Sequence, residues 1–581
     1  MKKYIYVWVS LILLSACGKD DGDDQVLLTD LSYGFRTYLQ ENFDILEKDG
    51  VVSLEKLAGI KEIDCSGKNI YSMLGIEYLV NLEKLNCSNN VISSLNVSKN
   101  PLLKELICDY NAIDTMNVSN NPMLKLLICD YNRIKELDAS KNPVLETLSC
   151  AGNSELNSIS LSPGIKSLDI TGHKMTSLDF KNDKNLKELY CGGPNITYLN
   201  VSNSVLEVLD CGGGKLTSLD LSGCTTLKTL ICDGDGFSLD FTHTPNIEKI
   251  NATAIENLDV SPLPLLKTLV CINSRLSNLD LRNNPALEVL RLSGTNISGA
   301  IDLSNNYQLT HVELGFSISQ TTLDLSNRKV LKELSSAGGE WILETLNLSG
   351  CTALETLMIA YETIRTLNVS NCTALTSIKC YNSRLSEMIL TGCSNLWTLY
   401  CEGNNLTSLN INDCVRLVDL NCANNQLTSL HVNSAYLTKI NCTSNLITET
   451  NLRNNSHIKI LYCSDNKMTA LDLTGCTALV ELDCRNNILL TSLNLTECNA
   501  LENLAVTNCS LSTLSVNHCA ELTNLYCAAN RLQPSLDVSK CTKLMELNCI
   551  SNAGLTELIL NQNHSIKPLH KDAHTQIKLV N

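Results

Sequence analysis

Residues 82–102 read LEKLNCSNNVISSLNVSKNPL, and this 21-residue unit recurs with little interruption along most of the 581-residue chain. The sixth position of the unit is a cysteine, and the next cysteines follow at steps of 21 residues. The column can be followed to Cys549 and is held mostly by cysteine, elsewhere by apolar or small residues. Such a period is typical of a solenoid, because one short unit cannot bury its apolar face without stacking on its neighbours.

The apolar residues of the unit follow two alternating patterns. Counted from Leu82, they occupy positions 1, 4, 6, 11, 14 and 16. Positions 4 to 6 alternate between inside and outside, as the side chains of a strand do. Positions 11 to 16 repeat this alternation, as in KLTSLDLS at residues 215–222. Since 21 residues leave no room for a helix between two extended segments, the pattern predicts a parallel sheet on the concave face and extended or 3₁₀ segments on the convex back.

Position 9 of the unit is mostly asparagine. A carboxamide both donates and accepts hydrogen bonds, so it can satisfy backbone groups where the chain bends out of a strand. We therefore expect a structural role for this column, which comprises Asn90, Asn111, Asn132, Asn153, Asn404, Asn425, Asn445, Asn466, Asn487, Asn530 and Asn552.

The cysteines form two columns. Of the 28 cysteines, 17 lie at position 6 and nine at position 19. Neighbouring parallel strands lie about 4.8 Å apart, which is slightly too far for a relaxed disulfide between in-register cysteines, and no CxxC or HxxxH pair proposes a zinc site. We expect a ladder of buried thiols that pack as small hydrophobic side chains; oxidised pairs at position 19 are the alternative. The ladder includes Cys87, Cys108, Cys129, Cys150, Cys401, Cys422, Cys463 and Cys484.

Runs of the form LxxLxCxxNxLTSLDLSxC, such as LWTLYCEGNNLTSLNINDC at residues 396–414, recur some 24 times. From about residue 31 to residue 560 the chain resembles internalin-like bacterial leucine-rich-repeat proteins, in particular the 21-residue subtype with cysteine at the sixth position. The resemblance implies a right-handed superhelix of the α/β horseshoe class, binding to proteins or host surfaces, and no catalysis. The chain departs from the pattern at residues 292–359, where Leu292, Leu314, Ser336 and Ile359 replace cysteine, and we expect a bulge or a change of curvature there.

The first 30 residues resemble the start of a bacterial lipoprotein. Lys2 and Lys3, a short apolar run and small residues predict a secretory signal peptide over residues 1–16, since a membrane span needs roughly 20 apolar residues. The sequence LSAC resembles a lipobox, which implies lipidation of Cys17. Residues 17–30 form an acidic tether, and its KDD resembles an export tag, so we expect display at the outer membrane; a plain linker is the alternative.

The ends of the repeat array differ from its middle. Residues 31–60 are expected to form a helical cap, because Phe35, Leu39 and Phe43 lie four residues apart. Residues 43–55 resemble a cap that often carries a calcium loop, but Ile45 and Lys56 fall on ligand positions, so no calcium is expected. We assign residues 61–560 to the solenoid and residues 561–581 to a C-terminal cap or tail. A solvated tail is preferred there to a metal site built from His564, His570, Asp572 and His574.

Charge and composition exclude several classes of function. The net charge of −16 argues against nucleic acid as a partner and against electrostatic docking to anionic lipid, so the membrane contact expected is the lipid anchor alone. The histidines of the repeats share no column, and no Ser/His/Asp set is suggested by spacing. We predict a protein that is not an enzyme and has no cofactor and no metal.

Aromatic residues are only 4% of the chain, so their positions on the outer face of the sheet are informative. That face should be formed by positions 3, 5, 7 and 8. The first aromatic patch is predicted from Ile107, Tyr110, Leu126, Ile128 and Tyr131. The second aromatic patch is predicted from Met358, Tyr361, Tyr381, Trp397 and Tyr400. Tyrosine and tryptophan combine contact area with a polar group and suit a protein or glycan ligand; tyrosines that only pack across strands are the structural alternative.

Two classes of function follow from these observations. The first is a surface-displayed adhesin or protein-interaction scaffold that uses the concave face. The second is a glycan-binding lipoprotein of a nutrient-uptake system, because aromatic platforms also bind sugar rings. The ligand, the oligomeric state and the side of the membrane that the protein faces are not determined by the sequence.

Overall fold

The computed structural model describes residues 26–47, 51–234, 236–274, 276–295, 297, 299–316, 321–336, 343–361 and 363–581. The signal peptide, Cys17 and most of the acidic tether therefore lie outside the described residues. The chain divides into two compact units, Met1–Lys174 and Met175–Asn581, and each is described by itself. Within the described residues, no helix is both long and apolar enough to cross a membrane.

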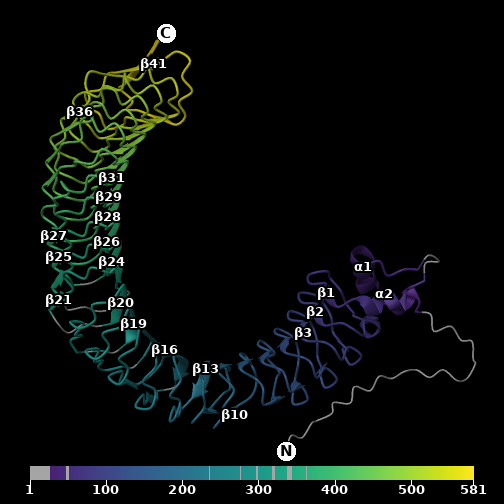
Figure 1. Ribbon diagram of the computed structural model, residues 1–581. Coiled ribbons are helices and arrows are strands. Elements are labelled where there is room, and N and C mark those ends of the chain that lie inside the picture. The colour runs from purple at the N-terminus through teal and green to yellow at the C-terminus, as the bar shows by residue number, and fades with distance from the viewer. Residues whose placement is uncertain are drawn as a thin grey trace, which may run out of the picture. The chain divides into compact units, whose positions relative to one another are not determined.

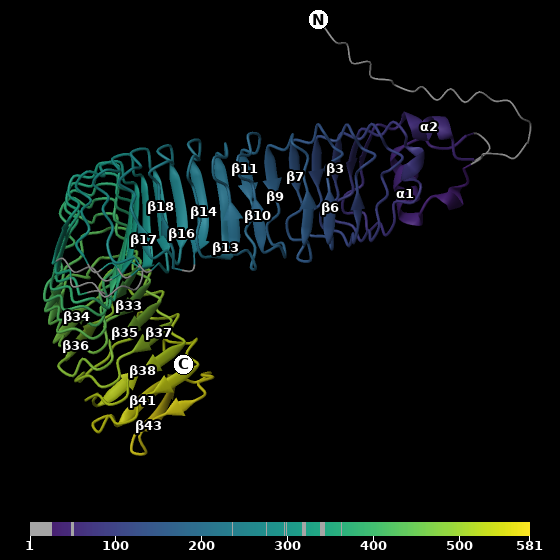
Figure 2. The ribbon, with the colours of Figure 1, turned by 90° about the horizontal axis from the view of Figure 1, so that it is seen from below.

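Unit 1 begins with the helices of the predicted cap. These are α1 (Tyr33–Asn42) and α2 (Leu54–Gly59). The short helix η1 (Leu28–Asp30) precedes them, within the residues predicted as a tether, and η2 (Ile76–Tyr78) follows within the first coil. The amphipathic helix predicted from the spacing of Phe35 and Leu39 is confirmed as α1, which buries both side chains. Figure 2 shows α1 and α2 at the end of the unit where the repeats start, where they cover the first coil.

Each coil of unit 1 contributes one short strand to a parallel front sheet (Figure 2). Consecutive strands pair one repeat apart, so that Leu85 lies beside Leu106 and Leu106 beside Leu127. The central side chain of each strand is buried, as the alternating pattern predicts. The front strands are β1 (Glu62–Asp64), β2 (Lys84–Asn86), β3 (Glu105–Ile107), β5 (Leu126–Ile128), β7 (Thr147–Ser149) and β9 (Ser167–Asp169), and the back strands are β4 (Met116–Asn117), β6 (Glu136–Asp138) and β8 (Ser158–Ser160).

Unit 2 repeats this arrangement over more coils, and its front strands also pair in parallel. Figure 1 shows the front strands β24, β26, β28 and β29 on the inner side of the bend of this unit, so the front sheet is its concave face. The front strands are β11 (Glu188–Tyr190), β13 (Val208–Leu216), β14 (Thr229–Gly234), β16 (Lys249–Thr253), β18 (Thr268–Ile272), β19 (Val289–Thr295), β20 (His311–Phe316), β22 (Glu333–Ser335), β24 (Thr356–Ala360), β26 (Ser377–Tyr381), β28 (Thr398–Tyr400), β29 (Asp419–Asn421), β31 (Lys439–Asn441), β33 (Ile460–Tyr462), β35 (Glu481–Asp483), β37 (Asn503–Ala505), β38 (Asn524–Tyr526), β40 (Glu546–Asn548) and β42 (Leu569–His570).

The back of unit 2 carries short parallel strands on many coils, with turns on the others. Figure 1 places β25, β27 and β36 on the outer side of the bend, so the convex side has more strand than the predicted extended or 3₁₀ segments require. The back strands are β10 (Ser177–Asp179), β12 (Tyr198–Asn200), β15 (Ser238–Leu239), β17 (Asn257–Leu258), β21 (Thr322–Asp324), β23 (Thr345–Asn347), β25 (Thr366–Asn368), β27 (Glu387–Ile389), β30 (Ser429–Leu430), β32 (Glu449–Thr450), β34 (Ala470–Asp472), β36 (Ser492–Asn494), β39 (Ser535–Asp537), β41 (Glu557–Asn561) and β43 (Gln576–Val580).

The C-terminal residues continue the solenoid. Strand β42 pairs with β40, and β43 pairs with β41, so residues 561–581 add a further coil to unit 2. The carboxylate of Asp572 accepts hydrogen bonds from the backbone N–H groups of Ser551 and Asn552, at 3.0 and 2.9 Å. Part of the tail that the sequence left as a solvated segment is therefore ordered on the preceding coil.

The core is a stack of leucines and position-6 cysteines. The 27 described cysteines are all buried free thiols. Burial raises the pKa of Cys87, Cys422 and Cys527 well above the ordinary value for a thiol, because the thiolate would lose its hydration inside the stack. Position 6 therefore packs as a hydrophobic side chain.

Position 19 has a different role, because it is a column of hydrogen-bond donors. Asn121 donates from Nδ2 to the carbonyl oxygens of Val97 and Asn100, at 3.0 and 2.9 Å. Cys372 donates from Sγ to the carbonyl oxygen of Leu348 at 3.1 Å. The Oδ1 atom of Asn121 is buried with no hydrogen-bond partner, so a thiol supplies a donor here without burying an unsatisfied acceptor.

The asparagines of position 9 bind backbone, as predicted. The amide of Asn132 donates to the carbonyl oxygens of Cys108, Cys129 and Asp130 at 3.0 to 3.1 Å. Its Oδ1 accepts from the backbone N–H of Ile113 at 2.9 Å. One side chain thus joins two neighbouring coils at the point where each leaves the front sheet.

The predicted irregularity is present, and a second one was not predicted. The register between β19 and β20 shifts between Ser293 and Thr295, which lies at the start of the stretch that departs from the repeat. A similar shift occurs between Cys211 and Leu216, where β13 pairs with β14. Position 6 of that coil is a cysteine, so the cysteine column does not predict this register shift.

Candidate binding surface

The residue at position 8 turns the chain out of the front sheet with a left-handed backbone. In unit 1 this position has φ values of 55° at Asn89, 52° at Tyr110, 48° at Tyr131 and 68° at Gly152. Asparagine and glycine tolerate this conformation, whereas a bulky side chain rarely adopts it. The two tyrosines are therefore unusual occupants of a position where most other coils use small or polar residues.

Tyr110 and Tyr131 stack on each other at the edge of the front sheet. Their ring centroids are 4.6 Å apart with an interplanar angle of 14°, and the residues are 51% and 53% exposed. On the next coil, a Cβ atom at Gly152 would lie 2.6 Å from Cδ1 of Tyr131, so glycine leaves the space for this ring. The result is a stacked pair of aromatic rings, each about half exposed to solvent.

The apolar residues predicted beside these tyrosines lie on the same two coils. Ile107 and Ile128 are register partners at position 5, and Leu126 at position 3 pairs with Glu105. All three apolar side chains are half-buried. The structure thus brings the members of the first aromatic patch together on two neighbouring coils.

Acidic side chains border the first aromatic patch. Asp130 accepts hydrogen bonds at Oδ1 from Ser149 Oγ and from the backbone N–H of Ala151, at 2.6 and 2.8 Å. Burial raises the pKa of Asp130 above its ordinary value, and the nearby Asp109 carboxylate adds to the rise while the two hydrogen bonds oppose it. The edge that carries the two rings is therefore electronegative.

The second aromatic patch is less compact than the first. Tyr361 and Tyr381 meet edge to face, with ring centroids 5.8 Å apart and an interplanar angle of 89°. Tyr361 also has a positive φ of 61° and is 67% exposed, so it repeats the feature seen at Tyr110. Met358 at position 5 is exposed on the same coil as Tyr361.

Trp397 and Tyr400 do not share the contact between Tyr361 and Tyr381. At position 5 the register runs from Met358 through Lys379 to Tyr400, so a lysine lies between the two predicted patch residues. Trp397 is 58% exposed, and none of the aromatic ring contacts among the described residues involves it. Of the five residues predicted for the second aromatic patch, Tyr361 and Tyr381 therefore form a ring contact, whereas Trp397 and Tyr400 lie apart from that contact.

Tyr400 takes part in the sheet itself. Its hydroxyl donates to Asp419 Oδ2 on the next strand at 2.6 Å, and this hydrogen bond, together with burial, raises the pKa of Tyr400 to about 12. Tyr526 bonds Glu546 in the same way at 2.7 Å. A tyrosine at position 5 with an acid at position 3 of the next coil is the sequence signal for this structural role, and the sequence analysis missed it.

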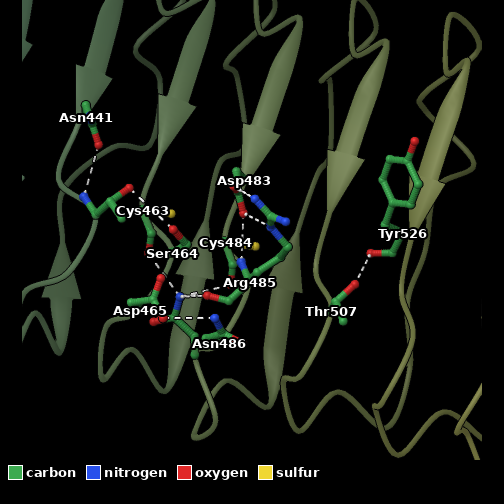
Figure 3. Close-up of polar contacts among 12 residues, drawn as sticks. Asn441, Cys463, Ser464, Asp465, Asp483, Cys484, Arg485, Asn486, Thr507 and Tyr526 are labelled. Atoms are coloured by element: carbon green, nitrogen blue, oxygen red, sulfur yellow. Dashed lines mark hydrogen bonds and ion pairs between the residues drawn. The ribbon is translucent and has the colours of Figure 1, made fainter.

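A polar network occupies the corresponding edge of the later coils (Figure 3). Arg485 donates to its neighbour Asp483 from Nε at 2.9 Å and from a terminal guanidinium nitrogen at 2.6 Å. Asn486 donates to Asp465 Oδ1 at 2.9 Å. These coils have asparagine or aspartate at position 8 where unit 1 has two tyrosines, so the aromatic edge is a local feature.

No cluster of three or more histidine, cysteine or acidic side chains placed to hold a metal ion occurs in the described part of the chain. The described histidines and Asp572 of the C-terminal coil form no such cluster either.

Comparisons with known proteins identify the fold. No family model matches the chain, and no curated protein matches its sequence. YopM from Yersinia enterocolitica is 19% identical, with 82% of this chain and 91% of that chain covered and a TM-score of 0.51. The plant peptide hormone receptor RGFR1, solved in complex with RGF2, is 16% identical, with 90% of each chain covered and a TM-score of 0.56.

The functional domain of InlJ from Listeria monocytogenes, described as including a cysteine ladder, is 22% identical over 90% of this chain and 78% of that chain. The TM-score of this match is 0.30. Identities at this level show the fold alone. Together with the repeat pattern and the stacked parallel strands, the likeness to YopM and RGFR1 shows that the chain is a leucine-rich-repeat solenoid.

Proposed function

We propose that this protein is a non-enzymatic binding scaffold whose first aromatic patch is the centre of a protein-binding surface. The observation that carries the proposal is the pair Tyr110 and Tyr131, which keep bulky exposed rings at left-handed backbone positions. A residue held in a sparsely populated conformation commonly marks a functional constraint. Rigid tyrosines contribute large contact area at a small cost in side-chain entropy, and they are frequent at binding hot spots.

The arrangement of the rings favours a protein over a glycan as ligand. A sugar ring stacks on an open aromatic face, but Tyr110 covers one side of the Tyr131 ring and Gly152 lies against the other. About half of each tyrosine stays exposed, with the half-buried Ile107 and Ile128 on the same two coils. A protein surface can fill such a relief with apolar side chains and hydrogen-bond to the hydroxyls.

The fold supports the same proposal. RGFR1, which shares the fold, was solved in complex with RGF2, and repeat solenoids offer extended concave surfaces for binding. We propose the second aromatic patch, with Tyr361 and Tyr381, as an additional protein-binding surface in unit 2.

A binding screen of residues 18–581 against immobilised mucin, collagen and dextran tests the proposal. The informative variant is Tyr110→Asn with Tyr131→Asn, because the preceding coil already has an asparagine, Asn89, with a positive φ at this position. We expect the variant to fold and to lose at least about tenfold in affinity for a protein ligand. The matched control is Tyr198→Asn, which removes a similarly exposed tyrosine from the back strand β12.

Equal binding by the double variant and the control would show that the first aromatic patch is not the binding surface. Binding of dextran alone, with loss in the same variant, would support the glycan-binding lipoprotein instead of a protein-binding scaffold. The unfolding midpoints of all variants should agree, because the lost ring stacking and the relieved backbone strain are each about 1 kcal/mol.

We also propose that Cys17 anchors the protein by lipid at the outer membrane, with the solenoid on the cell surface. The support is the sequence alone: a basic start, an apolar run, LSAC and an acidic tether. Mass spectrometry of the mature N-terminus, with Cys17→Ser as the control, tests the lipid, and protease shaving of intact cells tests display. An unmodified N-terminus, or protection from protease in intact cells, would refute the corresponding step.

A further inference from the structure

Three consecutive coils of unit 1 expose large apolar side chains at positions 20 and 21. Leu102, Met123 and Val144 are 42%, 45% and 41% exposed, and each follows an exposed proline. Several coils of unit 2 have alanine at this position, so the fold does not require a large side chain there. We name these residues the apolar strip: Pro101, Leu102, Pro122, Met123, Pro143 and Val144.

The strip is held in register by the asparagines that precede its prolines. Asn121 donates from Nδ2 to the carbonyl oxygen of Asn100, and Asn142 donates to that of Asn121, both at 2.9 Å. Neighbouring coils of a parallel sheet lie about 4.8 Å apart. The three apolar side chains therefore form one continuous exposed row and not three isolated contacts.

The surroundings of the strip are basic, although the chain as a whole carries a charge of −16. Lys99 and Lys141 lie at position 18 and Lys125 at position 2, and all three are exposed and form no ion pair among the described residues. The acids at position 2 of these coils are themselves paired, Glu83 with Lys104 and Glu146 with Lys166. The strip thus has a local excess of unpaired positive charge.

The strip and the two stacked tyrosines lie at opposite edges of the same coils. Position 21 comes directly before the front strand, whereas position 8 follows it, as Leu102 precedes β3 and Tyr110 follows it. A surface bound along the strip would leave the Tyr110–Tyr131 edge on the far side. Unit 1 can therefore hold two partners at once.

We propose that the apolar strip rests on a lipid bilayer that carries anionic headgroups, and so orients the first aromatic patch away from the membrane. Apolar side chains entering the interface, with lysines around them, are what such a surface attracts. This inference rests on the proposed lipid anchor at Cys17: eight residues separate Cys17 from Val26, so even a fully extended chain keeps Val26, at the start of unit 1, within roughly 30 Å of the lipid. The chain-wide charge predicted no such contact, because it averages out the local excess of lysine.

Vesicle flotation of residues 18–581, without the lipid, tests the inference apart from the anchor. These residues include every coil that the structure describes. We expect binding to phosphatidylcholine vesicles that contain about 30% phosphatidylglycerol, and weaker binding to pure phosphatidylcholine. The variant Leu102→Glu, Met123→Glu and Val144→Glu should bind at least about tenfold more weakly while its unfolding midpoint is unchanged. The matched control replaces exposed apolar residues near the same position of coils that are not adjacent, namely Leu265→Glu, Val330→Glu and Val415→Glu.

Equal loss in the strip variant and the control, or no binding to either vesicle, would overturn the inference. If sedimentation shows that the wild type self-associates and the strip variant does not, the strip binds a second copy of the chain and the bilayer is excluded as its occupant. The Tyr110→Asn, Tyr131→Asn variant should keep vesicle binding, and the strip variant should keep ligand binding. A failure of the proposed binding surface is in this way separated from a failure of the strip.

Discussion

Two regions of unit 2 use the same repeat but leave the front sheet in different ways. Between residues 398 and 548 each front strand has three residues, whereas between residues 208 and 316 the strands have five to nine. The later coils carry asparagine at position 9, as in Asn425 and Asn466, except that Cys509 replaces one of them. The middle coils have residues such as Gly214, Ile255 and Thr295 there.

The difference lies in how backbone carbonyls are satisfied. In the later coils the carbonyl oxygen of Cys442 accepts from Asn445 and Asn466 at 3.1 and 3.0 Å, so two side chains take the place of a strand partner. In the middle coils pairing continues along the strand, as between Asp233 and Thr253. A buried carbonyl must be bonded either way, and in these two regions an asparagine at position 9 accompanies the early turn, with Cys509 as the exception.

The largest expected effect comes from removing one of these asparagines. Asn466 is 1% exposed and makes four hydrogen bonds to backbone, three from its amide and one to its Oδ1. Asn466→Ala leaves buried backbone groups unsatisfied and should lower the free energy of unfolding by about 3 kcal/mol. Urea denaturation measures the loss, and hydrogen exchange should speed up first at Ile447, whose N–H loses its acceptor.

The control for that variant is Ser274→Ala in the middle coils. Ser274 is equally buried, but its hydroxyl makes one long bond of 3.4 Å to the carbonyl oxygen of Ile272. Its removal should cost less than about 1 kcal/mol. Similar losses in the two variants would contradict the explanation of strand length by position 9.

A smaller effect of opposite sign is expected at Cys509. This cysteine occupies the asparagine position of a coil whose strand still has three residues, and its Sγ donates to the carbonyl oxygen of Cys484 at 3.4 Å. Cys509→Asn restores the stronger amide donors and an acceptor, and should raise the free energy of unfolding by about 1 kcal/mol. Thermal unfolding measures the gain. A loss of stability would mean that the coil has adapted to the thiol.

The fold could be predicted from the sequence because every coil repeats the same constraint. Leucine, cysteine and asparagine at fixed positions define the core, the register and the exit from the strand, and position 9 was correctly assigned to structure. The donor role of position 19 was not predicted, because Cys372 and Asn121 look unrelated until both are seen to donate to the carbonyl oxygen at position 16 of the preceding coil.

The candidate surface was predicted less completely. The sequence predicts that Tyr110 and Tyr131 lie on adjacent coils, because they are one repeat apart and the repeat determines the register. It could not separate them from Tyr400, because the positive φ at position 8 and the hydrogen bond to Asp419 are three-dimensional facts. Strand lengths in the middle coils were missed for the same reason, since they depend on an absent asparagine and not on a residue that is present.

The smallest expected effect concerns a second difference between the two regions. In the later coils Tyr400 and Tyr526 at position 5 bond an acid on the next strand, whereas Ile231 and Val270 fill position 5 in the middle coils. The pKa of Tyr400 is raised to about 12, so the folded state favours the neutral phenol. Its contribution to stability is complete below the ordinary tyrosine pKa of about 10 and is lost as the pH rises from there toward 12.

The stability difference between wild type and Tyr400→Phe, measured by urea denaturation, should therefore be constant up to about pH 10 and shrink above it. Val270→Thr in a middle coil should show no such change in this range, and a difference between wild type and Tyr400→Phe that does not vary with pH would mean that the bond to Asp419 does not hold the phenol neutral.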